Sequence, residues 1–216
     1  GTATIEVPFN NTGTVNVTSG TLSLTGGGTH SGAFTAVAGS VLNFSSGTHT
    51  LNTGVGMSGA GKFLFSNSTT NIATGVTVAV SSASTFEQTG GTLGGAGMFT
   101  VNGTLNWTGG TMTGTGTTRI VTGATATISG TATKSMSAGR IFDNDGTANW
   151  TGGLWNVDAA TIQNDGVFNI AFDGTLQDGC CGVAPVFNNA GTLNRTTSTG
   201  TATIEVPFNN TGTVNV

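Results

Sequence analysis

Charged residues are scarce in this sequence of 216 amino acids. They make up 6% of the chain, whereas about 25% is usual for a globular domain. The five Lys and Arg residues are spread along the chain and form no basic stripe of the kind that binds nucleic acid. No run approaches the roughly 18 apolar residues of a membrane span, and no N-terminal secretion signal is visible. We therefore expect neither a nucleic-acid partner nor a membrane span in this segment.

The chain also lacks Tyr and holds only two Cys. In their place are 37 Gly, abundant Thr and Asn, and 36% hydrophobic residues that include 12 Phe and 3 Trp, with a net charge of −4. Disordered chains usually combine few aromatic and β-branched residues with a high net charge. This composition instead indicates a folded, β-rich protein. Its few Lys and Arg leave trypsin-like proteases few cleavage points, which suits a protein outside the cell.

Two repeats are nested in the sequence, and the longer one is exact. Residues 1–17 recur unchanged at 200–216, an offset of 199 residues. We interpret this as a tandem array with a 199-residue unit, of which residues 1–216 form a single continuous segment. An artificially duplicated flank is the alternative. A tandem array implies neighbouring copies of the same repeat as partners, end to end and also laterally.

The shorter repeat is degenerate. Its clearest copies, at 9–17, 142–150, 162–170 and 187–195, place an Asn- and Gly-containing turn before a short alternating strand. Marker glycines mostly recur every 20 to 28 residues, and the longer step from Gly39 to Gly75 predicts an extra coil or an inserted loop. No segment has the apolar spacing of a helix. The pattern predicts an all-β fold, a right-handed parallel β-helix (β-solenoid) with three short strands per coil and about 22 residues per coil.

Within each predicted strand, two apolar side chains lie two residues apart and so face the same side. Pointing inward, they are expected to stack on equivalents one coil away and form a continuous core. The predicted core stack is Val15, Val17, Leu42, Phe44, Leu105, Trp107, Phe168 and Ile170. Arg195 occupies an inward position of the same pattern, which indicates either an early strand end or a register slip.

Asn residues recur at coil spacing just before the marker glycines. Asn tolerates the left-handed backbone region, and stacked side-chain amides can hydrogen-bond from coil to coil. We therefore interpret these residues as a structural turn ladder, with a row of sugar-binding amides as the alternative. The ladder residues are Asn11, Asn144, Asn164 and Asn189.

The runs SGTLSLTGGGTHSGAF, GTLNWTGGTMTGTGT and FNNAGTLN resemble the β-solenoid repeats of large bacterial surface and secreted proteins. Autotransporter passengers and filamentous-haemagglutinin-type adhesins are examples of that group. The resemblance covers the whole chain in architecture and composition. It implies display at the cell surface or outside the cell, in adhesion, fibres or biofilm, and it carries over no catalytic residue.

Acidic residues concentrate between positions 143 and 178. Asp145 and Asp165 share one coil position, and together with Asp143 they are candidate ligands for Ca²⁺, which favours several oxygen ligands. Ordinary Asx turns are the favoured interpretation, so no cofactor is expected. Catalysis on polysaccharides would need carboxylates paired with a base or a metal in a groove. The sequence shows no such arrangement, and we expect no enzyme.

Two further pairs of residues could carry chemistry. His30 and His49 lie one coil apart by motif, with no Cys or carboxylate beside them, and we expect exposed imidazoles without a ligand. Cys180 and Cys181 are adjacent. The same pair in a next unit would lie roughly 40 Å away along the rod, too far for a disulfide. A strained vicinal disulfide, a lateral bond between rods and free thiols remain open, with a disulfide favoured outside the cell.

Three classes of function therefore compete. A structural extracellular fibre or stalk of a cell-surface or secreted protein is the favoured one, because the repeats are near-identical and the surface is bland. An adhesin or carbohydrate-binding module that recognises surface glycans is the alternative, and Trp155 is its only candidate for an aromatic residue on the outside. A polysaccharide-active enzyme is the third.

Overall fold

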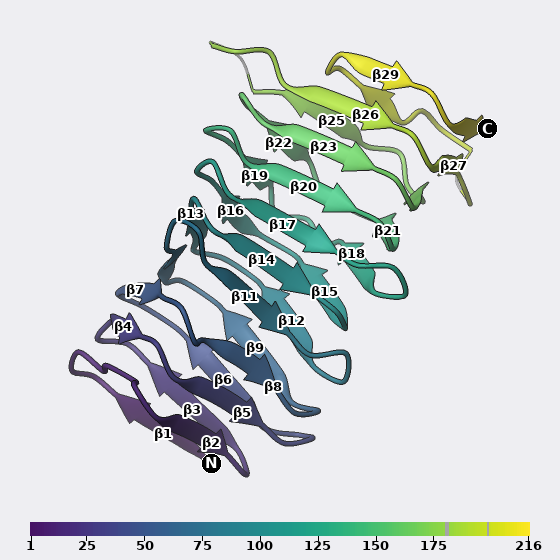
Figure 1. Ribbon diagram of the computed structural model, residues 1–216. Helices are drawn as coiled ribbons and strands as arrows, with labels where there is room; N and C mark the ends of the chain where they lie inside the picture. The colour runs from purple at the N-terminus through teal and green to yellow at the C-terminus, as the bar shows by residue number, and fades with distance from the viewer. Residues whose placement is uncertain (180–181, 198) are drawn as a thin grey trace.

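The structure is a computed structural model that describes residues 1–179, 182–197 and 199–216, and these residues form strands and turns but no helix. The strands lie parallel in three sheets, which we name A, B and C. The chain passes through A, B and C in turn and then returns to A one layer further along, so that it winds into a rod with the two termini at opposite ends (Figure 1). With about 21 residues per coil and about 10 turns, this is the predicted right-handed β-solenoid, which is confirmed.

Each sheet runs the length of the rod, and its strands follow one another from the N-terminal end. Sheet A contains β1 (Thr2–Ile5), β3 (Thr21–Leu24), β6 (Val41–Phe44), β9 (Lys62–Phe65), β12 (Thr85–Gln88), β15 (Thr104–Trp107), β18 (Thr125–Ile128), β21 (Thr147–Trp150), β24 (Val167–Ile170), β27 (Thr192–Arg195) and β30 (Thr213–Asn215). Sheet B contains β4 (Gly28–His30), β7 (Thr48–Leu51), β10 (Thr69–Ile72), β13 (Thr92–Gly95), β16 (Gly110–Met112), β19 (Lys134–Met136), β22 (Trp155–Val157), β25 (Thr175–Asp178) and β28 (Thr203–Ile204). Sheet C contains β2 (Thr14–Val17), β5 (Ala33–Ala36), β8 (Gly56–Ser58), β11 (Thr77–Val80), β14 (Met98–Val101), β17 (Thr117–Ile120), β20 (Ile141–Asn144), β23 (Thr161–Asn164), β26 (Val186–Asn189) and β29 (Phe208–Asn210).

The core runs along the axis of the rod, between the three sheets. Side chains alternate between core and surface along a strand, because successive residues of a strand point to opposite faces. In β15, Leu105 and Trp107 are fully buried, and Leu105 lies in register between Phe86 of β12 and Ala126 of β18. Of the eight predicted core residues, seven are no more than 5% exposed, and Val15 is partly buried against them.

The corner between sheets C and A is lined with glycine. Gly103, Gly123, Gly146 and Gly166 all precede strands of sheet A and so lie along this one edge. A Cβ atom at Gly166 would lie 2.2 Å from the carbonyl oxygen of Gly146, so this position accepts no larger residue. The backbones of successive coils can stack this closely because glycine has no side chain.

Gly75 lies at a different corner, and this explains the long step in the glycine series. It precedes β11 of sheet C, whereas Gly39 precedes β6 of sheet A. The step of 36 residues from one glycine to the other covers one coil and two further strand positions. The prediction of an extra coil or an inserted loop was therefore wrong, because the glycines mark two different corners of the coil.

The two copies of the 17-residue segment lie in different sheets. In the first copy, β1 is in sheet A, residues 9–11 bridge to β4 of sheet B through Asn11, and β2 is in sheet C. In the second copy, the equivalent residues form β28 in sheet B, β29 in sheet C and β30 in sheet A. One amino-acid sequence thus occupies all three sides of the coil, displaced by one sheet from one copy to the other.

Candidate functional site

The acidic residues predicted to lie together do so on the outer face of sheet C. Asp143 points outward from β20, while Asp145 and Asp165 follow β20 and β23 directly. Asn144 and Asn164, which precede these two residues, are register partners, so Asp145 and Asp165 occupy the same level of adjacent coils. One carboxylate oxygen from each of the three Asp residues lies within 4.8 Å of the others.

A cation of the protein itself lies at this cluster. The Arg119 guanidinium, on β17 one coil below, is 2.6 Å from the Asp145 carboxylate and 3.6 Å from that of Asp143. Gln163 donates a hydrogen bond of 2.9 Å to Asp165. Burial, followed by the charge of Asp145, raises the pKa of Asp143, and Arg119 opposes this shift. The arrangement is a network of ion pairs that ties neighbouring coils together.

Oxygen ligands in this number also suit a hard cation such as Ca²⁺, which Arg119 would oppose by its charge. The Ca²⁺ site at Asp143, Asp145 and Asp165 stays a prediction. It is tested by comparing the melting temperature in Ca²⁺ with that in EDTA. An unchanged melting temperature would exclude a bound Ca²⁺ ion.

His30 and His49 lie in the core, and the expectation of exposed imidazoles was wrong. Both side chains are fully buried, because their positions in β4 and β7 face inward. The His49 Nε2 donates to the carbonyl oxygen of Ser46 at 3.1 Å. Because the Nδ1 of a neutral His49 is then unprotonated, it accepts a hydrogen bond of 3.0 Å from the His30 Nε2. Burial, helped by the neighbouring His49, lowers the pKa of His30 to about 4, and burial also lowers that of His49. The pair is therefore neutral at physiological pH.

Trp155 is also buried, which contradicts its expected place on the outside. Its ring lies edge-on to Trp107 and Phe142, with ring centroids 5.3 Å and 5.4 Å apart. Trp107, Trp150 and Trp155 are all fully buried, so no Trp is presented to a sugar. The strand WNV at 155–157 has the same spacing of apolar residues as the predicted core strands, and this signal assigns Trp155 to the core.

The Asn residues form hydrogen-bonded rows along the rod. Side-chain amides link Asn144 to Asn164, Asn164 to Asn189 and Asn189 to Asn210 at 2.7 Å, 2.6 Å and 2.7 Å. Asn144, Asn164 and Asn189 are at most 1% exposed, so their amides serve the inside of the rod and cannot form a surface row for sugars. Asn11 lies outside this row. It is in line with sheet B, and its amide donates to the carbonyl oxygen of Ala33, the first residue of β5 in sheet C, at 3.1 Å.

Two buried cations carry no signal that distinguishes them in the sequence. The Lys134 amino group donates to the carbonyl oxygens of Ser129 and Gly152 at 2.7 Å and 2.9 Å, and burial lowers its pKa. Arg140 is fully buried, donates to the Thr118 hydroxyl at 2.5 Å, and has its pKa lowered to about 10 by burial. Both groups are held inside the rod and are not available to an external ligand.

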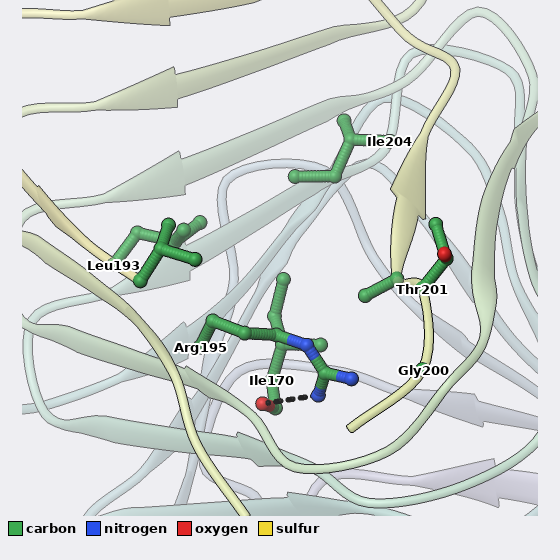
Figure 2. Close-up of a pocket in the computed structure, with 8 residues that line it drawn as sticks. Ile170, Leu193, Arg195, Gly200, Thr201 and Ile204 are labelled. Atoms are coloured by element: carbon green, nitrogen blue, oxygen red, sulfur yellow. Dashed lines mark hydrogen bonds between the residues drawn. The ribbon is translucent and has the colours of Figure 1, made fainter. Parts of the chain in front are cut away.

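A hollow of about 370 Å³ lies at the C-terminal end of the rod, and Figure 2 shows several of the side chains around it. Most of its wall is apolar, and Arg195 crosses one side. Its walls come from β24 and β27 of sheet A, from β28 of sheet B with the residues just before it, and from the C-terminal residue. The lining residues are Ile170, Leu193, Arg195, Gly200, Thr201, Ala202, Ile204 and Val216.

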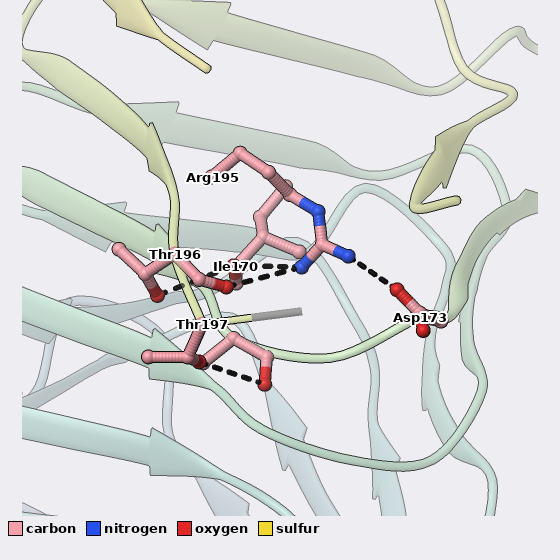
Figure 3. Close-up of polar contacts among 6 residues, drawn as sticks. Ile170, Asp173, Arg195, Thr196 and Thr197 are labelled. Atoms are coloured by element: carbon pink, nitrogen blue, oxygen red, sulfur yellow. Dashed lines mark hydrogen bonds and ion pairs between the residues drawn. The ribbon is translucent and has the colours of Figure 1, made fainter. Parts of the chain in front are cut away.

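Arg195 keeps its inward position without a register slip and without an early strand end. Strand β27 includes Arg195, which pairs in register with Ile170 of β24. The guanidinium reaches the corner, where it donates to the carbonyl oxygens of Ile170 and Thr196 at 3.2 Å and 3.3 Å and pairs with Asp173 (Figure 3). Both expected explanations were therefore wrong, because an arginine side chain is long enough to leave the core at the corner and find acceptors there.

The disulfide prediction concerns Cys180 and Cys181, which lie outside the described residues. The described part of the chain contains no helix that could span a membrane. Comparison of the sequence with family models and with curated proteins finds no match, and neither does comparison of the structure with solved structures.

Proposed function

We propose that this chain is a structural segment of an extracellular fibre or stalk, built from tandem β-solenoid repeats of a cell-surface or secreted protein. The observation that carries the proposal is the return of the first coil's sequence, residues 1–17, in the last coils of an unbroken solenoid. A solenoid whose end repeats its beginning can be continued without a change of architecture.

The contacts along the rod suit a mechanical role. Backbone hydrogen bonds run from coil to coil, the hydrophobic core extends along the rod, and the buried Asn row adds side-chain bonds in the same direction. The outer carboxylates near Arg119 are engaged in ion pairs. Each of these contacts joins neighbouring layers, so together they stiffen the rod along its length.

Extracellular placement and a non-catalytic role are parts of the same proposal. The low content of Lys and Arg supports this placement, because it leaves trypsin-like proteases outside the cell few cleavage points. Two of the five cations, Lys134 and Arg140, are also fully buried. A glycan-binding adhesin is less well supported, because its expected aromatic contact, Trp155, is in the core.

Electron microscopy of chains with one, two and three 199-residue units tests the proposal. A coil rises about 4.8 Å, so each unit of between nine and ten coils should lengthen a uniform rod by roughly 45 Å. Globular particles, or rods whose length does not grow with the number of units, would contradict a fibre. Filaments from the native source with a distinct tip would favour the adhesin.

A further inference from the structure

The two copies of the 17-residue segment show the two faces of one and the same coil. Val7 is 65% exposed in the first copy, whereas its equivalent Val206 is 4% exposed in the second. Val17 shows the reverse: it is 5% exposed in the first copy, and its equivalent Val216 is fully exposed. The first copy is covered only on its C-terminal side and the second only on its N-terminal side. A layer on the N-terminal side of the segment therefore buries the valine at positions 7 and 206, and a layer on its C-terminal side buries the valine at positions 17 and 216.

The first copy also shows which residues cover the second face. Strand β1 is covered by β3, with Ile5 in register with Leu24. Strand β2 is covered by β5, with Val17 in register with Ala36. Residues 9–11 are covered by β4, with Asn11 beside His30. The sequence that follows the segment in the unit, residues 18–51, therefore supplies a cover that fits this coil.

We propose that the end face formed by residues 200–216 is the seat of a following copy of residues 18–51 in the same chain, turned by one sheet relative to the first. This rests on the proposed tandem fibre. In this assembly the hollow at the end of the rod is an incomplete section of core. The following copy of Leu24 closes it above Ile204, and the following copy of Ala36 closes it above Val216.

The displacement by one sheet, which we call the turn of the unit, follows from the path of the chain between the copies. From β1 to β28 the chain completes nine coils and then moves one sheet further, from A to B. The unit of 199 residues therefore spans 28 strand positions, which three sheets do not divide evenly. A second unit continues with its strands on the next sheet, and the fourth unit is the first to regain the orientation of the first. Three units make 28 coils, a repeat of roughly 134 Å at about 4.8 Å per coil.

The turn of the unit determines which surface residues lie on each side of a long rod. The Arg119 and Asp145 cluster lies on sheet C in this unit. It would lie on sheet A in the next unit and on sheet B in the one after. Any feature of one side of the unit is thus carried around the rod, and all three sides of a long array are alike.

Cysteine crosslinking of the present chain tests the turn. Asn188 and Asn209 are register partners on the outer face of sheet C, with their side chains 3.0 Å apart. Adjacent Cα atoms at about 4.8 Å fall within disulfide range. In a background with both native Cys replaced by Ala, N188C/N209C should oxidise to a disulfide that peptide mapping identifies.

The matched control is Q177C/N209C. If the second copy kept the sheets of the first, residues 208–210 would lie on β25 of sheet B, beside Gln177. Crosslinking of Q177C/N209C in place of N188C/N209C would contradict the displacement by one sheet, and the proposal of a tandem fibre would stand.

Extension of the chain tests the seat. A copy of residues 18–51 is added after Val216, and hydrogen exchange of β29 and β30 is measured. We expect exchange at these strands to slow at least about tenfold, because covered strand amides open only with their neighbours. The control extension carries Asp in place of the added copies of Leu24 and Ala36 and should give no protection. Equal exchange in both extended chains would overturn the seat. The tandem fibre would fall only if the rod length in electron microscopy did not grow with the number of units.

Discussion

At the scale of single residues, the direction in which a side chain points sets the effect of its replacement. Leu105 is fully buried between Phe86 and Ala126. Leu105→Ala should lower the free energy of unfolding by about 2–5 kcal/mol, because it removes buried methyl groups and leaves a cavity. Denaturant unfolding measures this loss. Thr127→Ser, on the outer face of the neighbouring strand β18, is the control and should change stability by no more than about 0.5 kcal/mol.

The buried histidine pair predicts a pH dependence of stability. The pKa of His30 falls from 6.5 to about 4 on folding, so the unfolded chain binds a proton more tightly than the folded one. The stability that this shift contributes is complete above pH 6.5 and is lost as the pH falls toward 4, by up to about 3 kcal/mol.

Unfolding at pH 7, 6 and 5 measures this slope, and H30L/H49L is the comparison. This variant should lose much of the slope between pH 6.5 and 5, a range in which most carboxylates do not yet titrate. An identical slope in both proteins would show that the histidine pair is not its source.

At the scale of strands, the buried Asn row should matter more than a second row on the outer face of sheet A, where side-chain amides link Asn149, Asn169 and Asn194. Asn164 donates to Asn189 and to the Thr192 carbonyl oxygen, and it accepts from Asn144. Asn164→Ala leaves buried polar atoms without partners and should cost about 1–3 kcal/mol. Asn169→Ala, in the row that faces solvent, is the matched control and should cost under about 1 kcal/mol, since water can replace the amide. Thermal unfolding of the two variants ranks the rows.

Strand positions could be predicted from the sequence where the apolar signal was clear. Leu105 and Trp107 lie two apart around an outward Asn, and this spacing alone defines the inner face. The same spacing joins His49 to Leu51 and Lys134 to Met136, but a polar residue at an inward position does not reveal itself. Its place depends on acceptors in neighbouring coils, such as the carbonyl oxygen of Ser46 for His49.

The acidic cluster was predictable only in part, for a related reason. Asp145 and Asp165 follow equivalent Asn residues, so their common level follows from the repeat. Arg119 is 26 residues before Asp145, and its arrival at the same place depends on the lengths of the intervening turns. The same uncertainty about turn lengths hid the fact that Gly75 marks a second corner.

At the scale of the whole molecule, stability should be graded from the middle of the rod to its ends. Each coil contacts only its neighbours, so an end coil has half the support of a central one. We expect amides of β15 to exchange most slowly and those of β1 and β30 most rapidly, as hydrogen exchange with mass spectrometry would show. Uniform protection along the rod would contradict a solenoid that opens from its ends.

The direction of the backbone hydrogen bonds has a consequence for a rod under load. Because these bonds lie parallel to the long axis, tension on the termini pulls them apart one layer at a time. A coil of about 21 residues that opens gives up roughly 5 Å of rod and releases roughly 70 Å of extended chain. A tether of this kind would absorb a sudden pull by lengthening layer by layer, and rewinding would restore its length when the pull ends.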